Sequence, residues 1–121
     1  KDITVALAKQ VIEAILGQNA IKQISLLRVM RMTCKEYNVS EKKIFSKSRR
    51  AEIVLARHVA MFLCRELTSS SLVSIGNFFG NRDHSTVIHA CKTVEEKMKL
   101  DPSLENVIKN LKSNIVGGVH V

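Results

Sequence analysis

Apolar residues recur at intervals of three and four along most of the chain, which is the period of an amphipathic helix, and strand-like alternation is absent. We therefore expect an all-α protein. The pattern predicts helices over residues 4–16, 25–37, 40–45, 51–67, 71–79, 83–100 and 102–116. Residues that commonly cap, start or end helices stand at these boundaries, namely Ser25, Asn38, Ser40, Ser71, Gly80, Asp83 and Pro102.

The segment 51–67 is apolar on nearly every side of the predicted helix, which is typical of a central, buried helix. Its polar interruptions, Arg57, His58 and Arg65, are therefore candidates for a function. His58 and Arg65 are seven residues apart in the sequence, so they share one face of this helix.

Residues 71–100 have the pattern of a helix-turn-helix, because a short helix, a turn that contains Gly80 and a longer helix follow one another. The longer helix separates an apolar side from a polar one. The apolar side consists of Val87, Cys91, Val94 and Met98, and the polar side of Ser85, His89, Lys92 and Glu96. We expect a compact helical bundle built around this motif, with a Trp-repressor-like fold.

The charge of the chain limits the kinds of partner that it is expected to bind. The net charge is +8, and the segment 42–57 holds six basic residues against the single acidic residue Glu52. Within it, the residues from Lys47 to Arg50 read as an exposed basic loop. A basic surface of this kind attracts nucleic acid, an acidic membrane or an acidic protein.

Other classes of function do not fit the residue pattern. Cys34, Cys64 and Cys91 lie inside helical segments and are expected to be core residues rather than disulfide partners. His89 and Cys91 lie about 200° apart around a helix, so they cannot share a metal ion with His84. The chain has no P-loop and no hydrolase relay, so we expect no enzymatic activity in it. No apolar segment is long enough for membrane insertion.

The first turn of the 83–100 helix offers a partner hydrogen-bond donors, acceptors and a methyl group, from Asp83, His84, Ser85 and Thr86. In a basic chain the expected partner is DNA. The carboxylate of Asp83 can cap its own helix or accept a hydrogen bond from cytosine, and Ser85 or Thr86 can contact a base edge. His84 and His89 are candidates for contacts with bases or phosphates, or are simply solvated.

The run from Ser71 to Ala90 reads SLVSIGNFFGNRDHSTVIHA, and it resembles the signature of the C-terminal DNA-binding domain of the bacterial replication initiator DnaA family. Upstream, SKSRR at 46–50 and ARHVAM at 56–61 look like the basic loop and the following helix of that family. The resemblance extends over residues 25–115. Residues before Ser25 look like the end of the family's nucleotide-binding domain and its connecting helix.

The resemblance implies recognition of DnaA boxes in double-stranded DNA at the replication origin. In this family the recognition helix enters the major groove and the basic loop enters the minor groove. By motif, the residues implied for base readout are Asp83, His84, Ser85 and Thr86, with Arg49 in the minor groove. The residues implied for the DNA backbone are Arg57, His58, Arg65, Arg82 and His89, with Lys47 and Arg50 as lesser candidates.

The resemblance also divides the chain. Residues 1–24 are expected to be a connector helix and the end of a nucleotide-binding domain, 25–116 the helix-turn-helix domain and 117–121 a tail. ATP and magnesium are expected to bind in another domain of the full-length protein, and no cofactor or metal is expected here. The implied setting is the bacterial cytoplasm at the nucleoid, with the fragment monomeric and with protein regulators and acidic phospholipids as further partners.

Other hypotheses remain open from the residues alone. The chain could be a helix-turn-helix transcription regulator, a protein-docking module, or a nonspecific binder of nucleic acid or acidic membrane through residues 42–57. It also departs from the family pattern at Ala56 and Val73, where the family often has proline, at His58, which is commonly glutamine, and at Ser85, which is frequently threonine.

Overall fold

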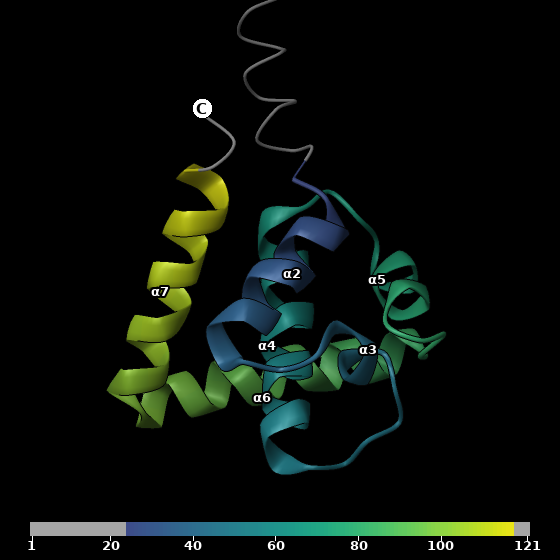
Figure 1. The fold of residues 1–121 in the computed structure, drawn as a ribbon, viewed down its shortest axis with the longest axis horizontal. Helices are drawn as coiled ribbons and strands as arrows, with labels where there is room; N and C mark the ends of the chain where they lie inside the picture. The colour runs from purple at the N-terminus through teal and green to yellow at the C-terminus, as the bar shows by residue number, and fades with distance from the viewer. Residues whose placement is uncertain (1–23, 118–121) are drawn as a thin grey trace, which may run out of the picture.

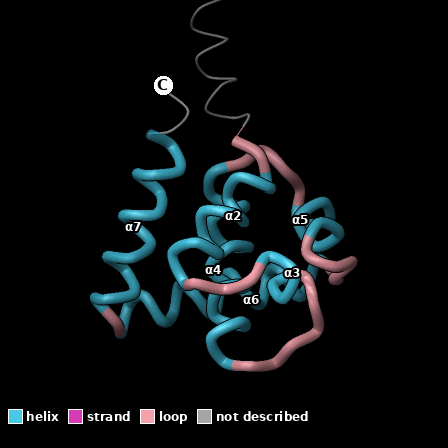
Figure 2. Tube along the Cα trace, viewed as in Figure 1, coloured by secondary structure: helices cyan, strands magenta, loops and turns pink. Residues whose placement is uncertain are grey.

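The computed structural model describes residues 24–117, which form six α-helices joined by short loops (Figures 1 and 2). The helices are α2 (Leu26–Tyr37), α3 (Glu41–Ile44), α4 (Ala51–Leu67), α5 (Leu72–Phe78), α6 (His84–Leu100) and α7 (Pro102–Gly117). No strand is present among these residues, so the all-α prediction is confirmed. The helix predicted over 4–16, most of the predicted connector and residues 118–121 lie outside the described part of the chain.

Helix α4 is the centre of the molecule, as its composition predicts. It packs chiefly against α6 and α2, while α3, α5 and α7 also contact it (Figure 1). Its residues from Val59 to Cys64 are all buried, because apolar side chains surround the helix. The core continues into the inner faces of its neighbours, with Val29 and Met30 from α2 and Val87 and Val94 from α6 fully buried.

The capping residues define the helix ends. The Ser25 hydroxyl accepts a hydrogen bond from the Arg28 amide (3.0 Å), and the Ser71 hydroxyl accepts one from the Ser74 amide (3.1 Å). Asn38 ends α2 in the left-handed conformation, with φ of 53°. Asp101 accepts hydrogen bonds from the amides of Ser103 and Leu104 at the start of α7. The side chains of Ser25, Ser71 and Asp101 satisfy amides that the first turn of a helix leaves without partners.

The turn between α5 and α6 depends on two glycines. A Cβ atom added to Gly76 would lie 2.2 Å from the carbonyl oxygen of Arg82, because the chain folds back so closely that the Arg82 amide donates to the Gly76 carbonyl (2.8 Å). Gly80 has a φ of +88°, and a Cβ there would lie 2.7 Å from the Phe45 carbonyl. Only glycine fits both positions without displacement. The turn is therefore held against α5 on one side and against the loop after α3 on the other.

The cysteines behave as the sequence predicts. Cys34, Cys64 and Cys91 are buried and unoxidised, and they fill the core between helices. Desolvation raises the pKa of the Cys34 thiol to about 11, so the group stays neutral at physiological pH. None of the helices formed by residues 24–117 is both long enough and apolar enough to cross a membrane.

Candidate nucleic-acid interface

The basic loop, residues 46–50, connects α3 to α4 and carries the exposed side chains of Lys47, Arg49 and Arg50. Its own serines shape it. The Ser46 hydroxyl donates to the Lys43 carbonyl (2.6 Å) and accepts from the Ser48 amide (3.1 Å), and the Ser48 hydroxyl accepts from the Arg50 amide (3.3 Å). These short-range bonds keep the backbone in a defined turn while the cationic side chains point to solvent.

Arg57 supports this loop from within. All three nitrogen atoms of its guanidinium donate to backbone carbonyls, and the side chain is only 6% exposed. The acceptors are the carbonyls of Ile44 (2.8 Å), Ser48 (3.1 Å), Ser46 (2.9 Å) and Lys43 (3.4 Å). The family resemblance implied a phosphate contact for Arg57. The structure instead places its guanidinium among the carbonyls of the loop, where it replaces water as their donor.

Arg82 reaches the same loop from the turn before α6. Its side chain is half-buried, and its terminal nitrogen Nη2 donates to the Ser46 carbonyl, which Arg57 also contacts. Desolvation lowers the pKa of both arginines, and Arg82 lowers that of Arg57 further because the two cations are close. Both remain charged, since arginine loses its proton only at very high pH.

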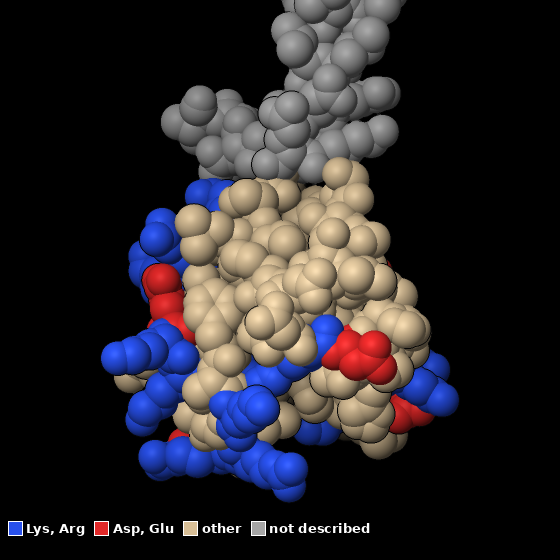
Figure 3. All heavy atoms as spheres, turned by 90° about the vertical axis from the view of Figure 1, so that its right-hand side faces the viewer, with Lys and Arg blue, Asp and Glu red and all other residues tan. Residues whose placement is uncertain are grey.

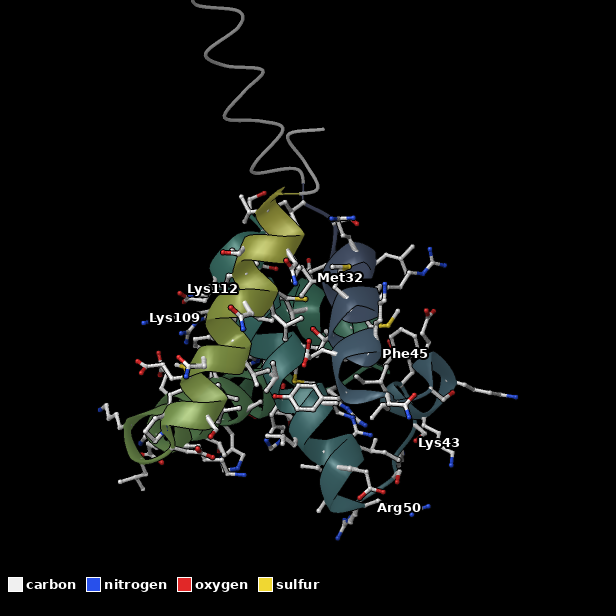
Figure 4. All side chains as sticks on the ribbon, turned by 60° about the vertical axis from the view of Figure 1, so that its left-hand side comes forward. Met32, Lys43, Phe45, Arg50, Lys109 and Lys112 are labelled. Carbon is white, nitrogen blue, oxygen red and sulfur yellow. The ribbon has the colours of Figure 1, made fainter. Side chains whose placement is uncertain are left out.

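These contacts bring residues from three segments to one surface. Lys47, Ser48 and Arg49 from the basic loop, Val54, Arg57 and His58 from α4, and Arg82 from the turn line an open hollow of about 310 Å³. Arg50 does not line this hollow: it pairs with Glu52, with Nε 3.0 Å from Oε1, and lines a separate hollow with Lys43. Figure 4 shows Lys43, on α3, and Arg50, directly before α4, pointing away from the core.

The first turn of α6 is exposed next to this hollow. Asp83, His84, Ser85 and Thr86 all face solvent. Asp83 occupies the N-cap position as predicted, but its carboxylate makes no capping hydrogen bond to a backbone amide. It accepts instead from the Ser85 hydroxyl (2.5 Å) and lies 3.2 Å from Nδ1 of His84. The bond from Ser85 and the nearby His84 lower the pKa of Asp83, so it is an ionised acceptor.

His58 and His89 extend the surface along α4 and α6. Their rings meet edge to face with centroids 6.2 Å apart. His58 is half-buried, and His89 is exposed on the polar side of α6. Burial lowers the pKa of His58, and the nearby His89, Lys97, Arg57 and Arg82 lower it further. His58 therefore favours the neutral form when no anion is present.

Arg65 is placed differently from the other predicted residues. It lies seven residues beyond His58, roughly 10 Å further along α4. Its Nη2 is 2.8 Å from Oε2 of Glu95 and 3.2 Å from Oε2 of Glu66, and its guanidinium lies 5.5 Å from the centre of the Phe62 ring. The hydrogen bond to Glu95 raises the pKa of Arg65. Arg65 is thus in an ion-pair network rather than in the hollow.

The surface charge follows this division. In Figure 3, Lys and Arg gather at the lower end and along the left edge of the face that α5 occupies, and the upper middle of that face carries neither. The sequence explains the contrast, because residues 68–81 include no charged side chain. Residues 68–81 therefore add no charge to a contact surface for a polyanion on this face.

Sequence reasoning places Gly80 in the turn but misses the Ser46 carbonyl and Gly76 as parts of the site. A backbone carbonyl leaves no signal in a sequence, and Gly76 looks like an ordinary helix residue. The signal that was available is Arg57, a cation inside an otherwise apolar helix, because such a group needs acceptors near it.

Known proteins resemble this chain in sequence and structure. The family model described as the bacterial DnaA protein helix-turn-helix matches residues 26–94. The chromosomal replication initiator protein DnaA of Lachnoclostridium phytofermentans is 39% identical over 108 residues, which are 89% of this chain and 24% of that protein. The DnaA protein of Limosilactobacillus reuteri is 41% identical over 113 residues, which are 93% of this chain and 26% of that protein.

A solved structure described as a DNA replication initiation factor superposes with a TM-score of 0.71 and 29% identity, covering 84% of this chain and 31% of that one. The chain thus spans about a quarter of the length of the curated relatives that it matches. The matched family segment includes the basic loop, α4, α5 and the first part of α6. The chain belongs to the bacterial DnaA helix-turn-helix family.

Proposed function

We propose that this chain binds double-stranded DNA sequence-specifically, at DnaA boxes of a replication origin, and so takes part in the initiation of chromosomal replication. The first turn of α6 lies in the major groove and the basic loop in the adjacent minor groove. One observation carries this proposal: the exposed α6 turn and the exposed Arg49 are parts of one surface, joined through Arg57 and Arg82.

The chemistry of the α6 turn suits a base edge in the major groove. The ionised carboxylate of Asp83 accepts a hydrogen bond from the amino group of cytosine, and the methyl group of Thr86 contacts a thymine methyl. His84 and Ser85 supply donors that rotate to meet a base. Arg49 suits the minor groove, where a narrow groove concentrates negative potential around an inserted guanidinium.

The remaining cations position the duplex. Lys47, Arg50, His58 and His89 flank the two reading elements and contact phosphates, which supply affinity without sequence information. Arg65 contacts a phosphate further along the backbone. Protein regulators and acidic phospholipids are further partners in this proposal. ATP and magnesium bind elsewhere in the full-length protein, which acts in the cytoplasm at the nucleoid, and the chain itself binds as a monomer and catalyses no reaction.

The test compares a duplex that contains a DnaA box with a scrambled duplex of the same composition, using fluorescence anisotropy at several salt concentrations. Arg49→Ala and His84→Ala should each weaken binding to the box by about 1–3 kcal/mol and binding to the scrambled duplex much less. Lys109→Ala, on the exposed side of α7 (Figure 4), is the matched control for loss of one positive charge, and it should preserve the preference for the box.

The other outcomes identify the competing functions. Equal losses on both duplexes would show nonspecific binding through the basic surface, which depends on salt but not on sequence. Absence of DNA binding by the wild-type chain at low salt would favour a protein-docking module. A preference for the box in the wild-type chain that neither substitution reduces would reject the assigned reading residues.

A further inference from the structure

We propose that Arg82 is a positioning residue for DNA recognition: through the Ser46 carbonyl it fixes the basic loop at a set distance and angle from the first turn of α6. The inference rests on the proposed function, in which these two elements enter neighbouring grooves. It gives Arg82 a role other than the phosphate contact implied by the family resemblance.

The Ser46 carbonyl is where the two reading elements meet. It accepts hydrogen bonds from Nη2 of Arg57 (2.9 Å) and from Nη2 of Arg82. Ser46 lies three residues before Arg49, and Arg82 directly precedes Asp83. One carbonyl oxygen therefore connects the predicted minor-groove arginine with the predicted major-groove helix, over a sequence separation of 36 residues.

Arg82 is itself held firmly on the helix-turn-helix side. Its amide donates to the Gly76 carbonyl (2.8 Å), and the close approach of the chain at Gly76 leaves no room for a side chain there. A residue anchored through its backbone in this way transmits the position of the turn to whatever its side chain binds. The loop thus takes its position from α5 and α6 and not from α4 alone.

The start of the loop is attached to the same motif by aromatic packing. The ring of Phe45 meets that of Phe78 edge to face at 5.3 Å and lies 6.0 Å from that of Phe79. Phe79 is fully buried, and Gly80 lets the turn approach the Phe45 carbonyl. The packing fixes where the loop begins, and the bond from Arg82 fixes its next residue, so the loop has two attachments to the helix-turn-helix.

The exposure of the cations distinguishes those that can contact DNA from those that hold the basic loop in place. Lys47, Arg49 and Arg50 are exposed, whereas Arg57 is buried and Arg82 is half-buried. The Nε atom of Arg82 is buried without a hydrogen-bond partner among the described residues, so it does not face a phosphate. A hydrogen bond to a base edge is weakened strongly when the side chain that makes it moves by an ångström. Loss of the Arg82 bond should therefore reduce the preference for one DNA sequence more than it reduces the electrostatic attraction to DNA in general.

A double-mutant cycle of Arg82→Ala and Arg49→Ala tests the proposal on the DnaA-box duplex. If Arg82 positions Arg49, the two losses overlap. We expect Arg49→Ala to weaken binding about tenfold in the wild-type chain and about twofold or less in the Arg82→Ala chain. The slope of log affinity against log salt should fall by well under one in Arg82→Ala, because Arg82 itself contacts no phosphate and the long, exposed side chains of Lys47 and Arg50 can still reach phosphates when the loop shifts. Lys109→Ala with Arg49→Ala is the control pair and should be additive.

Hydrogen exchange of the DNA-free chain provides a second measurement. The Ser48 and Arg50 amides donate to serine hydroxyls within the loop, and they should exchange faster in Arg82→Ala, whereas the amides of α7 should not. If Arg82→Ala exchanges throughout the chain, it is unfolded, and the cycle and the exchange experiment are repeated with Arg82→Met, which keeps an aliphatic stem for packing but has no donor for the Ser46 carbonyl.

Two results would overturn the inference. The first is that the losses from Arg82→Ala and Arg49→Ala add and that the salt slope of Arg82→Ala is lower by about one, which would identify a phosphate contact. The second is that the Ser48 and Arg50 amides exchange no faster in Arg82→Ala than in the wild-type chain. Failure of the proposed function looks different. In that case the wild-type chain shows no preference for the box, while the exchange experiment still reports whether Arg82 holds the loop.

Discussion

The imidazole of His58 in α4 meets that of His89 in α6 edge to face, with the ring centroids 6.2 Å apart. Burial lowers the pKa of His58 from its usual value of 6.5, and the positive groups around it, with His89, act in the same direction. The folded protein therefore binds fewer protons at His58 than the unfolded chain does when the pH falls below this value. Stability from this group is fully present above pH 6.5 and is lost as the pH falls through the lowered pKa.

We predict that His58→Gln, which retains a polar side chain, reduces the fall in the free energy of unfolding between about pH 7 and pH 5. Urea unfolding of both proteins at a series of pH values measures this. The difference between the two curves isolates His58, because the carboxylates contribute equally to both. Parallel curves would show that the lowered pKa of His58 has no effect on stability.

The helices and the polar side of α6 could be predicted from the sequence because both depend on local patterns. The expected apolar stripe on α6 is buried at Val87, Cys91 and Val94, and the opposite side, which includes Ser85 and His89, is exposed. The period of a helix alone determines this division. The prediction of a helix-turn-helix is likewise confirmed, because Ser71 and Gly80 act where their local chemistry placed them.

The arrangement of the arginines could not be predicted, because it depends on segments far apart in the sequence. The family resemblance implied a contact with the DNA backbone for Arg57, Arg65 and Arg82 alike. In the structure Arg57 binds carbonyls from residues 43–48, Arg82 binds a carbonyl 36 residues away, and Arg65 binds Glu95, which is 30 residues away. The apolar surroundings of Arg57 indicate that its guanidinium needs acceptors inside the protein, but nothing near Arg65 or Arg82 in the sequence distinguishes a guanidinium that meets a carbonyl or carboxylate from one that meets a phosphate.

Arg57 should matter for stability more than any cation of the basic loop. Arg57→Ala removes the guanidinium donor of the Ile44 and Ser48 carbonyls and one of the donors of the Ser46 and Lys43 carbonyls, and we predict a loss of about 2–3 kcal/mol in the free energy of unfolding. Arg49→Ala is the matched control in the same surface and should change it by less than about 0.5 kcal/mol, because its side chain is exposed. Urea unfolding measures both. Equal effects would mean that the hydrogen bonds of Arg57 contribute no net stability.

The close approach of the turn to α5 predicts a strong effect of a single methyl group. Gly76→Ala places a Cβ atom against the Arg82 carbonyl, and backbone must move to accommodate it, so we expect a loss of about 2–4 kcal/mol. Gly117→Ala is the control, because nothing lies within 4 Å of a Cβ atom there. Thermal unfolding compares the two. A midpoint in Gly76→Ala as high as in Gly117→Ala would contradict the observed geometry of the turn.

The ion pair between Arg65 and Glu95 predicts that an acidic residue restrains DNA binding. Glu95 holds the Arg65 guanidinium at 2.8 Å, and a phosphate would have to compete with this carboxylate for the same donors. We therefore predict that Glu95→Gln raises affinity for box and scrambled duplexes alike and steepens the salt dependence by up to about one phosphate contact. The measurement is anisotropy titration at several salt concentrations.

Removing any negative charge from a DNA-binding protein can raise affinity, so the gain has to be shown to act through Arg65. Glu105→Gln removes an exposed carboxylate on α7 and should produce only the general effect, which salt screens. In an Arg65→Ala background, Glu95→Gln should then raise the affinity for DNA no more than Glu105→Gln does, because there is no Arg65 guanidinium to release. If Glu95→Gln still raises the affinity for DNA more than Glu105→Gln does when Arg65 is absent, the Glu95 carboxylate repels DNA directly. The prediction that Glu95 keeps Arg65 from binding a phosphate would then be wrong.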